Sequence, residues 1–313
     1  MEEVRDLIII GAGGAGLSAA QYGARANLST LVLEELASGG QALIIDNLEN
    51  YPGFPEPLAG TELVQRFEDQ AVRFGAEIRY ASAQSVSRKD ELFVVQTDSG
   101  ELTARAVILA TGAKHRTVDV PGEKELAGHG VSYCATCDGP FFKGRRMLVV
   151  GGGDAACDEA AYLANLSESV LMIHRRDRFR AQKSLAERTL RNPHIQVRFN
   201  HELAKIEGSG KVERVTLLDK NDGRSYQEKL EAVFVFVGSL PQTAVVQGLG
   251  VELDPGGYVV TDQRMQTSVR GLFAVGDVRS TPFRQLVVAA GEGAIAAHAA
   301  SQYIDELKGE AYL

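Results

Sequence analysis

The stretch that decides the fold is Leu7–Gly16, which reads Leu-Ile-Ile-Ile-Gly-Ala-Gly-Gly-Ala-Gly, and Leu148–Ala156 repeats its pattern as Leu-Val-Val-Gly-Gly-Gly-Asp-Ala-Ala. In each copy an apolar run ends in closely spaced glycines. A stretch of small residues follows, Ala19–Ala26 in the first copy and Ala155–Ala164 in the second. The two glycine clusters begin 140 residues apart (151 − 11). The repeated order predicts a strand, a glycine turn and a helix, twice in one chain.

The glycine clusters fit the turn of a unit that binds a dinucleotide. Its first glycine permits a tight turn, the second lets the backbone approach a pyrophosphate, and the third lets helix and strand pack closely. The pyrophosphate lies at the helix N-terminus, where free N–H groups favour an anion. One such cluster alone fits an ordinary turn, but two copies in this context favour two cofactor sites. The expected contacts are Gly11, Gly13, Gly14, Ala15 and Gly16 in the first copy, and Gly151, Gly153, Asp154, Ala155 and Ala156 in the second.

The end of the next apolar run distinguishes the two sites. Thr30–Leu33 and Val170–Ile173 keep the same offset of 140 residues. Glu34 follows the first run, and a carboxylate there accepts hydrogen bonds from ribose hydroxyls and repels a 2′-phosphate. Arginines follow the second run, and their planar guanidinium groups bind a 2′-phosphate bidentately, although a solvated basic face is the plainer alternative. The first site thus fits FAD or NAD, and the second fits NADPH, held by His174, Arg175, Arg176 and Arg180.

Two later apolar runs predict how the chain divides. Each run ends in glycine: the first is Val107–Gly112 and the second Val233–Gly238. We expect each to bring the chain back to the nucleotide site of its own unit, which adds Thr111 and Gly112 to the first site. Pro121-Gly122 and Leu240-Pro241 then read as linkers. The sequence therefore predicts an α/β fold of two Rossmann-like, three-layer domains that bind FAD and NAD(P), the second inserted into the first. The predicted bounds are 1–115 with 244–313 for the FAD-binding domain, and 116–243 for the NADPH-binding domain that carries the redox cysteines.

The C-terminal part of the chain is expected to resume the first domain. Leu272–Asp277 reads as a strand followed by glycine and an acid, and Ala289–Leu307 reads as a helix. Further short strands are predicted at Phe93–Thr97, Thr103–Ile108 and Tyr258–Thr261.

Cys134 and Cys137 form a C-x-x-C pair just before the turn Gly139-Pro140. At the start of a helix this spacing brings the two sulfurs close enough for a disulfide, and the helix N-terminus can lower a thiol pKa. The neighbouring Asp138 could relay a proton. A structural zinc site or two unpaired core cysteines are the alternatives. Cys157 is expected to be a small core residue.

Composition limits the class of protein. The chain has 313 residues and a net charge of −8, which argues against a general nucleic-acid binder. It shows neither a signal peptide nor an apolar run of the ~18 residues that a membrane span needs. Three cysteines do not make the disulfide framework of a small secreted protein. We therefore expect a cytoplasmic protein.

Taken in order, these motifs resemble those of low-molecular-weight, bacterial-type thioredoxin reductases. The resemblance covers nearly the whole chain. Besides the two glycine loops, the motifs that carry it are Gly39-Gly40-Gln41, Glu49–Gly53, Cys134–Asp138, His174-Arg175-Arg176 with Arg180, and Gly276-Asp277 followed by Arg284-Gln285.

The resemblance implies a homodimer that contains FAD, uses NADPH and reduces thioredoxin or a thioredoxin-like protein. It implies that Cys137 faces the flavin, Cys134 attacks the substrate disulfide and Asp138 is the acid–base group. It implies a rotation of the NADPH domain, and we expect the hinge for this rotation in the linkers near Pro121 and Pro241. Phe141 and Phe142 match a docking patch for thioredoxin, with core packing as the alternative. The residues implied along the FAD are Gly39, Gly40, Gln41, Asn50, Gly276, Asp277, Arg284 and Gln285.

The sequence departs from the family pattern at three places. Ala155 stands where the family usually has a hydroxyl residue, Ala42–Ile45 replaces a threonine-rich segment, and Gln242 replaces a common Asn.

A disulfide reductase of the same fold that takes electrons from ferredoxin or another flavin is one rival function, against which the arginine cluster argues. A non-catalytic redox sensor that binds nucleotides is the other.

Overall fold

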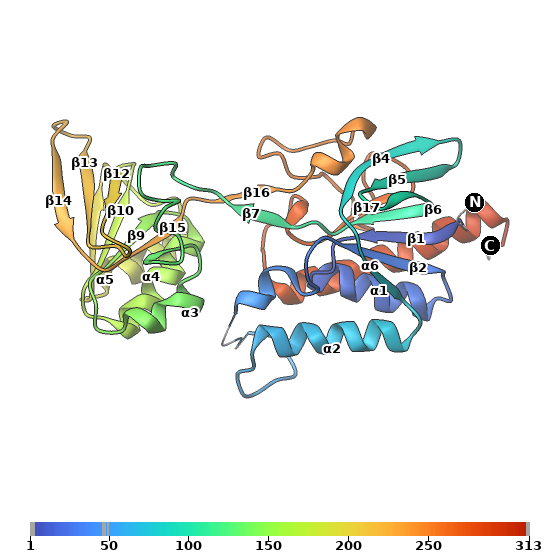
Figure 1. Ribbon diagram of the computed structural model, residues 1–313, viewed down its shortest axis with the longest axis horizontal. Coiled ribbons are helices and arrows are strands. Elements are labelled where there is room, and N and C mark those ends of the chain that lie inside the picture. The colour runs from blue at the N-terminus through green and yellow to red at the C-terminus, as the bar shows by residue number, and fades with distance from the viewer. Residues whose placement is uncertain (1–3, 46–47, 49, 311–313) are drawn as a thin grey trace. The chain divides into compact units, whose positions relative to one another are not determined.

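The computed structural model describes residues 4–45, 48 and 50–310. They form two compact units, Met1–Lys114 with Leu240–Leu313 and His115–Ser239. The predicted crossings at 115/116 and 243/244 lie one and four residues from these bounds. The chain crosses along two short strands, β7 (Ala113–His115) and β16 (Ser239–Pro241), which pair with each other (Figure 1).

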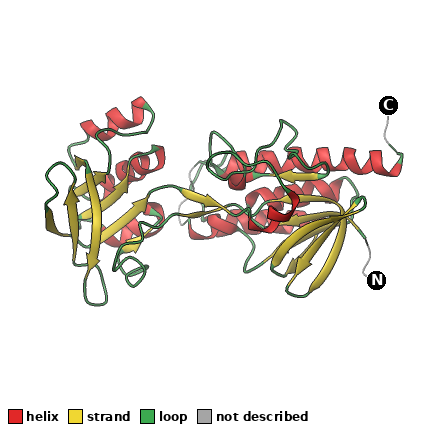
Figure 2. Ribbon diagram, turned by 90° about the horizontal axis from the view of Figure 1, so that it is seen from above, coloured by secondary structure: helices red, strands yellow, loops and turns green. Residues whose placement is uncertain are grey.

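The first unit is built on a mixed sheet with the strand order β3-β2-β1-β6-β5-β4, and β17 lies beside β6. Figure 2 shows the strands in yellow and the helices in red. The strands β1, β2, β3, β6 and β17 pair in parallel, whereas β4, β5 and β6 form an antiparallel meander. Its elements are β1 (Arg5–Ile10), α1 (Gly14–Arg25), β2 (Thr30–Glu34), η1 (Gly40–Ile44), α2 (Gly60–Arg73), β3 (Glu77–Tyr80), β4 (Ala83–Lys89), β5 (Leu92–Thr97), β6 (Gly100–Leu109), η3 (Ala244–Leu249), β17 (Leu272–Ala274), η4 (Gly276–Val278) and α6 (Leu286–Lys308).

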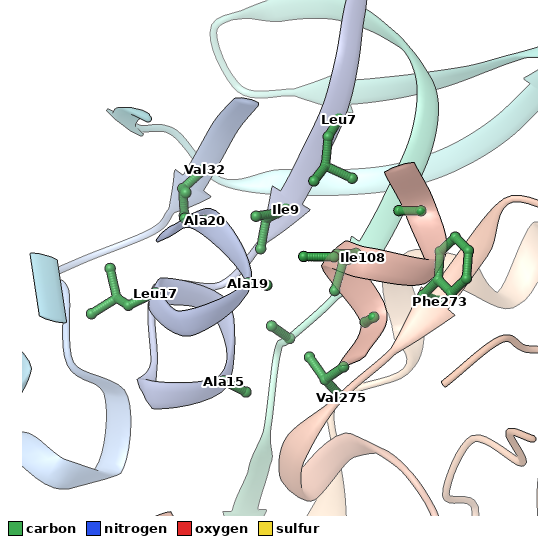
Figure 3. Close-up of a cluster of buried hydrophobic side chains, with 14 of the residues drawn as sticks. Leu7, Ile9, Ala15, Leu17, Ala19, Ala20, Val32, Ile108, Phe273 and Val275 are labelled. Carbon is green, nitrogen blue, oxygen red and sulfur yellow. The ribbon is translucent and has the colours of Figure 1, made fainter. Parts of the chain in front are cut away.

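Both faces of this sheet are buried, which explains the continuous apolar run of β1. Leu7 and Ile9 face the cluster that also contains Leu17 of α1, Phe273 of β17 and the inner side of α6 (Figure 3). Ile8 and Ile10 face a second cluster on the side of the β4–β5 meander and η3. A strand covered on both faces reads as an unbroken apolar run because successive side chains alternate between the faces.

The second unit repeats this plan with a five-stranded parallel sheet, ordered β11-β10-β9-β15-β8. The helices α4 and α5 cover one face, and a three-stranded antiparallel sheet, β12-β13-β14, covers the other. Its elements are β8 (Val131–Ser132), α3 (Ala135–Asp138), η2 (Gly139–Phe142), β9 (Met147–Gly151), α4 (Asp154–Leu166), β10 (Val170–His174), α5 (Lys183–Arg191), β11 (Ile195–Phe199), β12 (His201–Glu207), β13 (Arg214–Asp219), β14 (Ser225–Lys229) and β15 (Ala232–Phe236).

The internal repeat extends to strand register. Leu7 of β1 pairs with Thr30 of β2, and 140 residues further on Met147 of β9 pairs with Val170 of β10. The predicted fold class, two Rossmann-like three-layer domains, is confirmed. Among the helices of the described segments, none combines the length and apolar character needed to cross a membrane.

The strand predicted at Tyr258–Thr261 is wrong. Only Val259 makes bridges there, one to Leu253 and one to Arg279. The Asp254 carboxylate accepts hydrogen bonds from the backbone N–H groups of Gly256 and Tyr258 at 2.8 and 3.0 Å. These bonds close a turn, and the pairing ends after a single residue on each side. The predicted strands at Phe93–Thr97 and Thr103–Ile108 lie within β5 and β6 and are confirmed.

Candidate active site

The first glycine loop brings the start of α1 close to the ends of two strands. A Cβ at Gly11, where φ is +104°, would lie 2.4 Å from the Ala110 carbonyl oxygen. A Cβ at Gly16 would lie 1.9 Å from the Gly11 carbonyl oxygen. Both positions therefore exclude a side chain. Space beside Gly13 is open, and no side chain of the described residues caps the helix there, so the N-terminus of α1 can receive a pyrophosphate.

Glu34, the last residue of β2, has its carboxylate turned toward the glycine loop. The backbone N–H of Ala12 donates to Oε2 at 2.8 Å, and the N–H of Leu36 donates to Oε1 at 3.1 Å. These bonds fix the carboxylate, and each oxygen keeps lone pairs that can accept further hydrogen bonds. This is the geometry that a ribose diol needs at the end of the second strand.

The Gly39–Gly40 loop lies against the glycine loop. The N–H of Gly39 donates to the carbonyl of Ala12 at 2.7 Å, and a Cβ at Gly40 would lie 3.3 Å from the Cα of Gly13. The hydroxyl of Ser38, directly before this loop, is buried and has no hydrogen-bond partner among the described residues. An unpaired buried hydroxyl points to a partner that the protein itself does not supply, so this cradle fits a bound cofactor. We did not predict Ser38, since a lone serine carries no motif.

Residues far apart in the sequence meet near the flavin motifs. The Asn50 amide donates to the Gln285 side chain at 2.9 Å across a sequence distance of 235 residues. The Gln41 amide donates to the carbonyl of Ala113 at 2.8 Å. Thr111 donates to the carbonyl of Gln242 at 2.7 Å. The structure thus ties several residues of the predicted FAD set to the first unit; of the motif Glu49–Gly53, Glu49 lies outside the described residues.

A buried ion pair holds the Gly276–Asp277 turn. Glu292 of α6 accepts a hydrogen bond from the backbone N–H of Gly276 at 2.7 Å and pairs with Arg279. The side chains of Arg279 and Glu292 are only 13% and 7% exposed. A Cβ at Gly276 would lie 3.1 Å from that of Ala15, so the turn that carries the half-buried Asp277 lies beside the start of α1. Arg284, also a predicted FAD contact, is exposed, and its guanidinium lies 4.1 Å from the ring centre of Tyr258.

The second glycine loop repeats the close backbone contacts of the first. A Cβ at Gly151 would lie 2.4 Å from the Phe236 carbonyl oxygen, as the one at Gly11 would from Ala110. The ring of His174 packs so tightly on Gly152 that a Cβ there would lie 2.3 Å from Nδ1. Burial, then the nearby arginines, lower the pKa of His174, so the ring is neutral near pH 7. Its Nε2 is buried and has no partner among the described residues, a second orphan group at a predicted cofactor site.

An open cavity of about 750 Å³ lies beside this loop. The N–H of Arg180 donates to the carbonyl of Gly152 at 2.7 Å and brings the arginine segment back to the loop. Within the described part of the chain, the arginines that line the cavity form no ion pair, so they are available to an anion. Arg175, although predicted here, is exposed and does not line it. The lining residues are Arg176, Asp177, Arg178, Phe179, Arg180 and Asn200, of which Arg176 and Arg180 were predicted.

The redox segment joins β8 to the short helix α3. Cys134 is disulfide-bonded. Its N–H donates to the Ser132 hydroxyl at 3.1 Å, and its carbonyl accepts from the N–H of Asp138 at 3.2 Å. The side chain of Cys137 lies outside the described part of the structure. Cys157 is free and 1% exposed within the core of α4, which confirms the prediction of a core cysteine, and burial raises the pKa of its thiol.

The two phenylalanines that follow the redox helix differ. Phe142 packs edge-on against Phe234 of the core, with ring centres 6.2 Å apart. Phe141 is 78% exposed. Core packing thus explains Phe142, whereas Phe141 is free to meet a partner.

Comparison with known proteins identifies the class. Residues 5–293 match the pyridine nucleotide-disulphide oxidoreductase family. The chain is 53% identical over 308 residues to a thioredoxin reductase of Treponema pallidum (98% of this chain, 100% of the relative), and 46% identical to one of Bacillus subtilis (98% and 97%). Its structure resembles the Lactococcus lactis thioredoxin reductase in the FR conformation, with a TM-score of 0.84 and 37% identity over 96% and 99% of the chains. The chain therefore belongs to the thioredoxin reductases within the pyridine nucleotide-disulphide oxidoreductases, whose members use FAD and NADPH.

The buried pair of Arg279 and Glu292 should affect the affinity for FAD. Replacing Glu292 with glutamine removes the anion and leaves Arg279 buried without its charge partner, so the Gly276–Asp277 turn should loosen. We expect the dissociation constant for FAD to rise about tenfold or more, since breaking a buried pair costs ~3–5 kcal/mol. Flavin fluorescence on dilution measures it. Glu306→Gln is the control: Glu306 belongs to the same helix, its pair with Arg270 is exposed, and its replacement should release no extra flavin.

Glu159 of α4 predicts a pH dependence of stability. Its Oε2 is buried and has no hydrogen-bond partner in the part of the chain that the structure describes, and burial, then Asp158, raises the pKa of the carboxyl from 4.5 to about 7. Between these values the folded protein binds more protons than the unfolded chain, so stability should fall as the pH rises from about 4.5 to 7. Glu159→Gln should flatten this fall and raise the melting temperature at pH 8 by ~3 °C or more. The exposed Glu168→Gln is the control, and a Glu159→Gln profile identical to wild type would contradict the assignment.

Proposed function

We propose that this chain reduces the disulfide of thioredoxin, or of a thioredoxin-like protein, with electrons from NADPH through FAD and the Cys134–Cys137 pair. One observation carries the proposal: the unit whose arginine-lined cavity suits a 2′-phosphate also holds the disulfide of Cys134. We propose Cys137, the other cysteine of the C-x-x-C pair, as its disulfide partner, and Cys157 is free. The names of the relatives support the same reaction.

The first unit is assigned to FAD. The N-terminus of α1, with Gly13 open to a ligand, would receive the pyrophosphate, and Glu34 would accept from the ribose hydroxyls. The Ser38 hydroxyl, which has no partner among the residues that the structure describes, would gain one. We assign residues 1–115 and 244–313 to the FAD domain, with the sequence-predicted contacts Gly11, Gly14, Ala15, Gly16, Gly39, Gly40, Gln41, Asn50, Thr111, Gly112, Gly276, Asp277, Arg284 and Gln285.

Residues 116–243 are assigned to NADPH. The N-terminus of α4 would receive its pyrophosphate at Gly151, Gly153 and Asp154. Among the described residues no side chain caps this helix, so its backbone N–H groups are available although Ala155 offers no hydroxyl. Arg176 and Arg180, together with Arg178 and Asn200, would bind the 2′-phosphate. Bound FAD would supply the chemistry that passes an electron pair from the nicotinamide to the disulfide.

The protein's own sulfurs would carry out the final exchange. In the reduced protein, the Cys134 thiolate attacks one sulfur of the substrate disulfide, and the other substrate sulfur leaves as a thiolate that takes a proton. The Cys137 thiolate then attacks the Cys134 sulfur of the mixed disulfide. This restores the Cys134–Cys137 bond and releases the second substrate thiolate. Asp138, at the end of α3 and half-buried beside the pair, is the proposed proton donor.

Phe141 is the proposed contact for the protein substrate. Because it is 78% exposed and follows the redox helix, Phe141→Ala should raise the KM for thioredoxin about fivefold or more, as loss of an exposed aromatic anchor does. Turnover of a small disulfide such as dithionitrobenzoate should not change. Leu190→Ala removes another exposed apolar side chain of the same unit and should leave both reactions unaffected. Equal KM values for Phe141→Ala and wild type would exclude a docking role.

Steady-state NADPH oxidation in the presence of thioredoxin tests the proposed function. A reductase consumes NADPH continuously until the disulfide is exhausted. A redox sensor reduces its flavin once and stops, and a ferredoxin-linked reductase does not respond to NADPH. We also propose a homodimer, as the resemblance implies, and a cytoplasmic location, as the sequence pattern predicts.

A further inference from the structure

We propose that Glu123 and Tyr133 are positioning residues that hold Cys134 in the geometry of its disulfide. The inference rests on the proposed function for its meaning, but it concerns residues that this function leaves unused. Its basis is a buried carboxylate that ties the segment after the first crossing to the residue preceding Cys134.

Glu123 is 0% exposed, yet no Lys, Arg or His among the described residues pairs with it. Its carboxylate is held by hydrogen bonds alone. The backbone N–H of Val118 donates to both oxygens at 3.0 Å, and that of Asp119 donates to Oε2 at 2.6 Å. The Tyr133 hydroxyl donates to Oε1 at 2.9 Å. Since a buried carboxylate without donors is costly, these bonds fix both the segment and the tyrosine.

Tyr133 is held at both ends of its side chain. Its ring stacks on that of His115, with centres 6.2 Å apart and planes 13° from parallel. Burial, together with the Glu123 carboxylate, raises the pKa of the Tyr133 hydroxyl, so it remains a donor. On its other side, Ser132 belongs to β8, which pairs with β15. The backbone that enters Cys134 is therefore anchored by a strand on one side of Tyr133 and by the tyrosine itself.

The segment that Glu123 holds is attached to the body of the second unit. The N–H of Ile206 in β12 donates to the carbonyl of Pro121 at 2.9 Å. At Gly122, where φ is +89°, a Cβ would lie 1.9 Å from the carbonyl oxygen of Ile206. We expected a hinge near Pro121, but this docking makes Pro121 part of the unit.

This arrangement has a consequence for the redox pair. A disulfide forms only when the two Cβ atoms lie about 3.5–4.5 Å apart, and a fixed backbone raises the effective concentration of one thiol at the other. Loosening Tyr133 widens the positions open to Cys134 in the dithiol form. The equilibrium between disulfide and dithiol should then shift toward the dithiol. Exchange with a substrate should slow, because the Cys137 thiolate must reach a less well positioned Cys134 sulfur in the second attack.

Tyr133→Phe tests the proposal. It removes one hydroxyl and keeps the ring over His115. We expect the equilibrium constant for disulfide formation, measured against glutathione, to fall about fivefold, which is ~20 mV on the scale of 29.6 mV per tenfold change. Amide exchange at Val118 and Asp119 should accelerate. Tyr226→Phe is the matched control, because that hydroxyl accepts from Arg198 at 2.9 Å and its ring meets His201 in the same unit, away from Cys134.

The outcomes separate a positioning role from a merely structural one. A redox potential for Tyr133→Phe equal to that of wild type would overturn the proposal, even if the variant were less stable. Glu123→Gln, which replaces one acceptor oxygen by a donor, should shift the potential in the same direction; Tyr133→Phe still decides if that variant does not fold. The glutathione titration needs neither NADPH nor thioredoxin. A wild type that fails to reduce thioredoxin would therefore contradict the proposed function and leave this inference standing.

Discussion

Cys134→Ser should lower turnover with thioredoxin about a thousandfold or more, as removal of a nucleophile does in enzymes that act through one. The serine hydroxyl cannot form the disulfide in which Cys134 takes part. Reduction of the flavin by NADPH in a single turnover should persist, because the arginine-lined cavity and both glycine loops are intact. Stopped-flow absorbance of the flavin and steady-state NADPH oxidation measure the two steps separately.

Cys157→Ser is the matched control for this variant. The same atom is exchanged in the same unit, but Cys157 is free and buried in the core. We expect a loss of stability and nearly normal turnover at 25 °C. If Cys157→Ser abolished turnover and Cys134→Ser did not, the redox assignment would be reversed.

Arg176→Ala combined with Arg180→Ala should raise the KM for NADPH about a hundredfold. Each lost hydrogen bond to a charged group is worth ~1.5–3 kcal/mol, and the two arginines line the same cavity. The KM for NADH, which has no 2′-phosphate, should change little. Because Arg175 does not line the cavity, Arg175→Ala should have the smaller effect, although the sequence pattern treats the two neighbours alike.

Arg188→Ala controls for the loss of positive charge from this unit. Arg188 pairs with Asp158 at 2.6 Å and does not line the cavity. Its replacement should leave the ratio of NADPH to NADH use unchanged. If the double variant raised the KM for NADPH and for NADH by the same factor, the cavity would not bind the 2′-phosphate.

The sequence was sufficient for the repeated unit because its signals are local. Strand, glycine turn and helix follow one another within about 20 residues, and the need for glycine at Gly11 and Gly16 arises from contacts inside that unit. The same holds for Glu34, which ends the strand next to the loop it contacts. Even the strand register of the second copy follows from the first.

Tertiary contacts decided what the sequence did not predict. Glu292 lies in the middle of a helix, and only the fold brings it to Gly276 and Arg279. Asn200 reaches the arginine-lined cavity from the connection between β11 and β12. Glu123 belongs to no recognisable sequence motif, because its partners are backbone N–H groups and a tyrosine ten residues away. Such residues are visible only when burial and hydrogen bonding are known.

Anaerobic titration of the FAD-loaded protein with NADPH tests the central claim most directly, since a flavin and a disulfide in electronic contact are two separate two-electron acceptors. The wild type should take up about two equivalents before NADPH accumulates, and Cys134→Ser about one, with two thiols appearing only in the wild type. Uptake of a single equivalent by the wild type, with no new thiols, would contradict electron transfer from nicotinamide to the Cys134 disulfide.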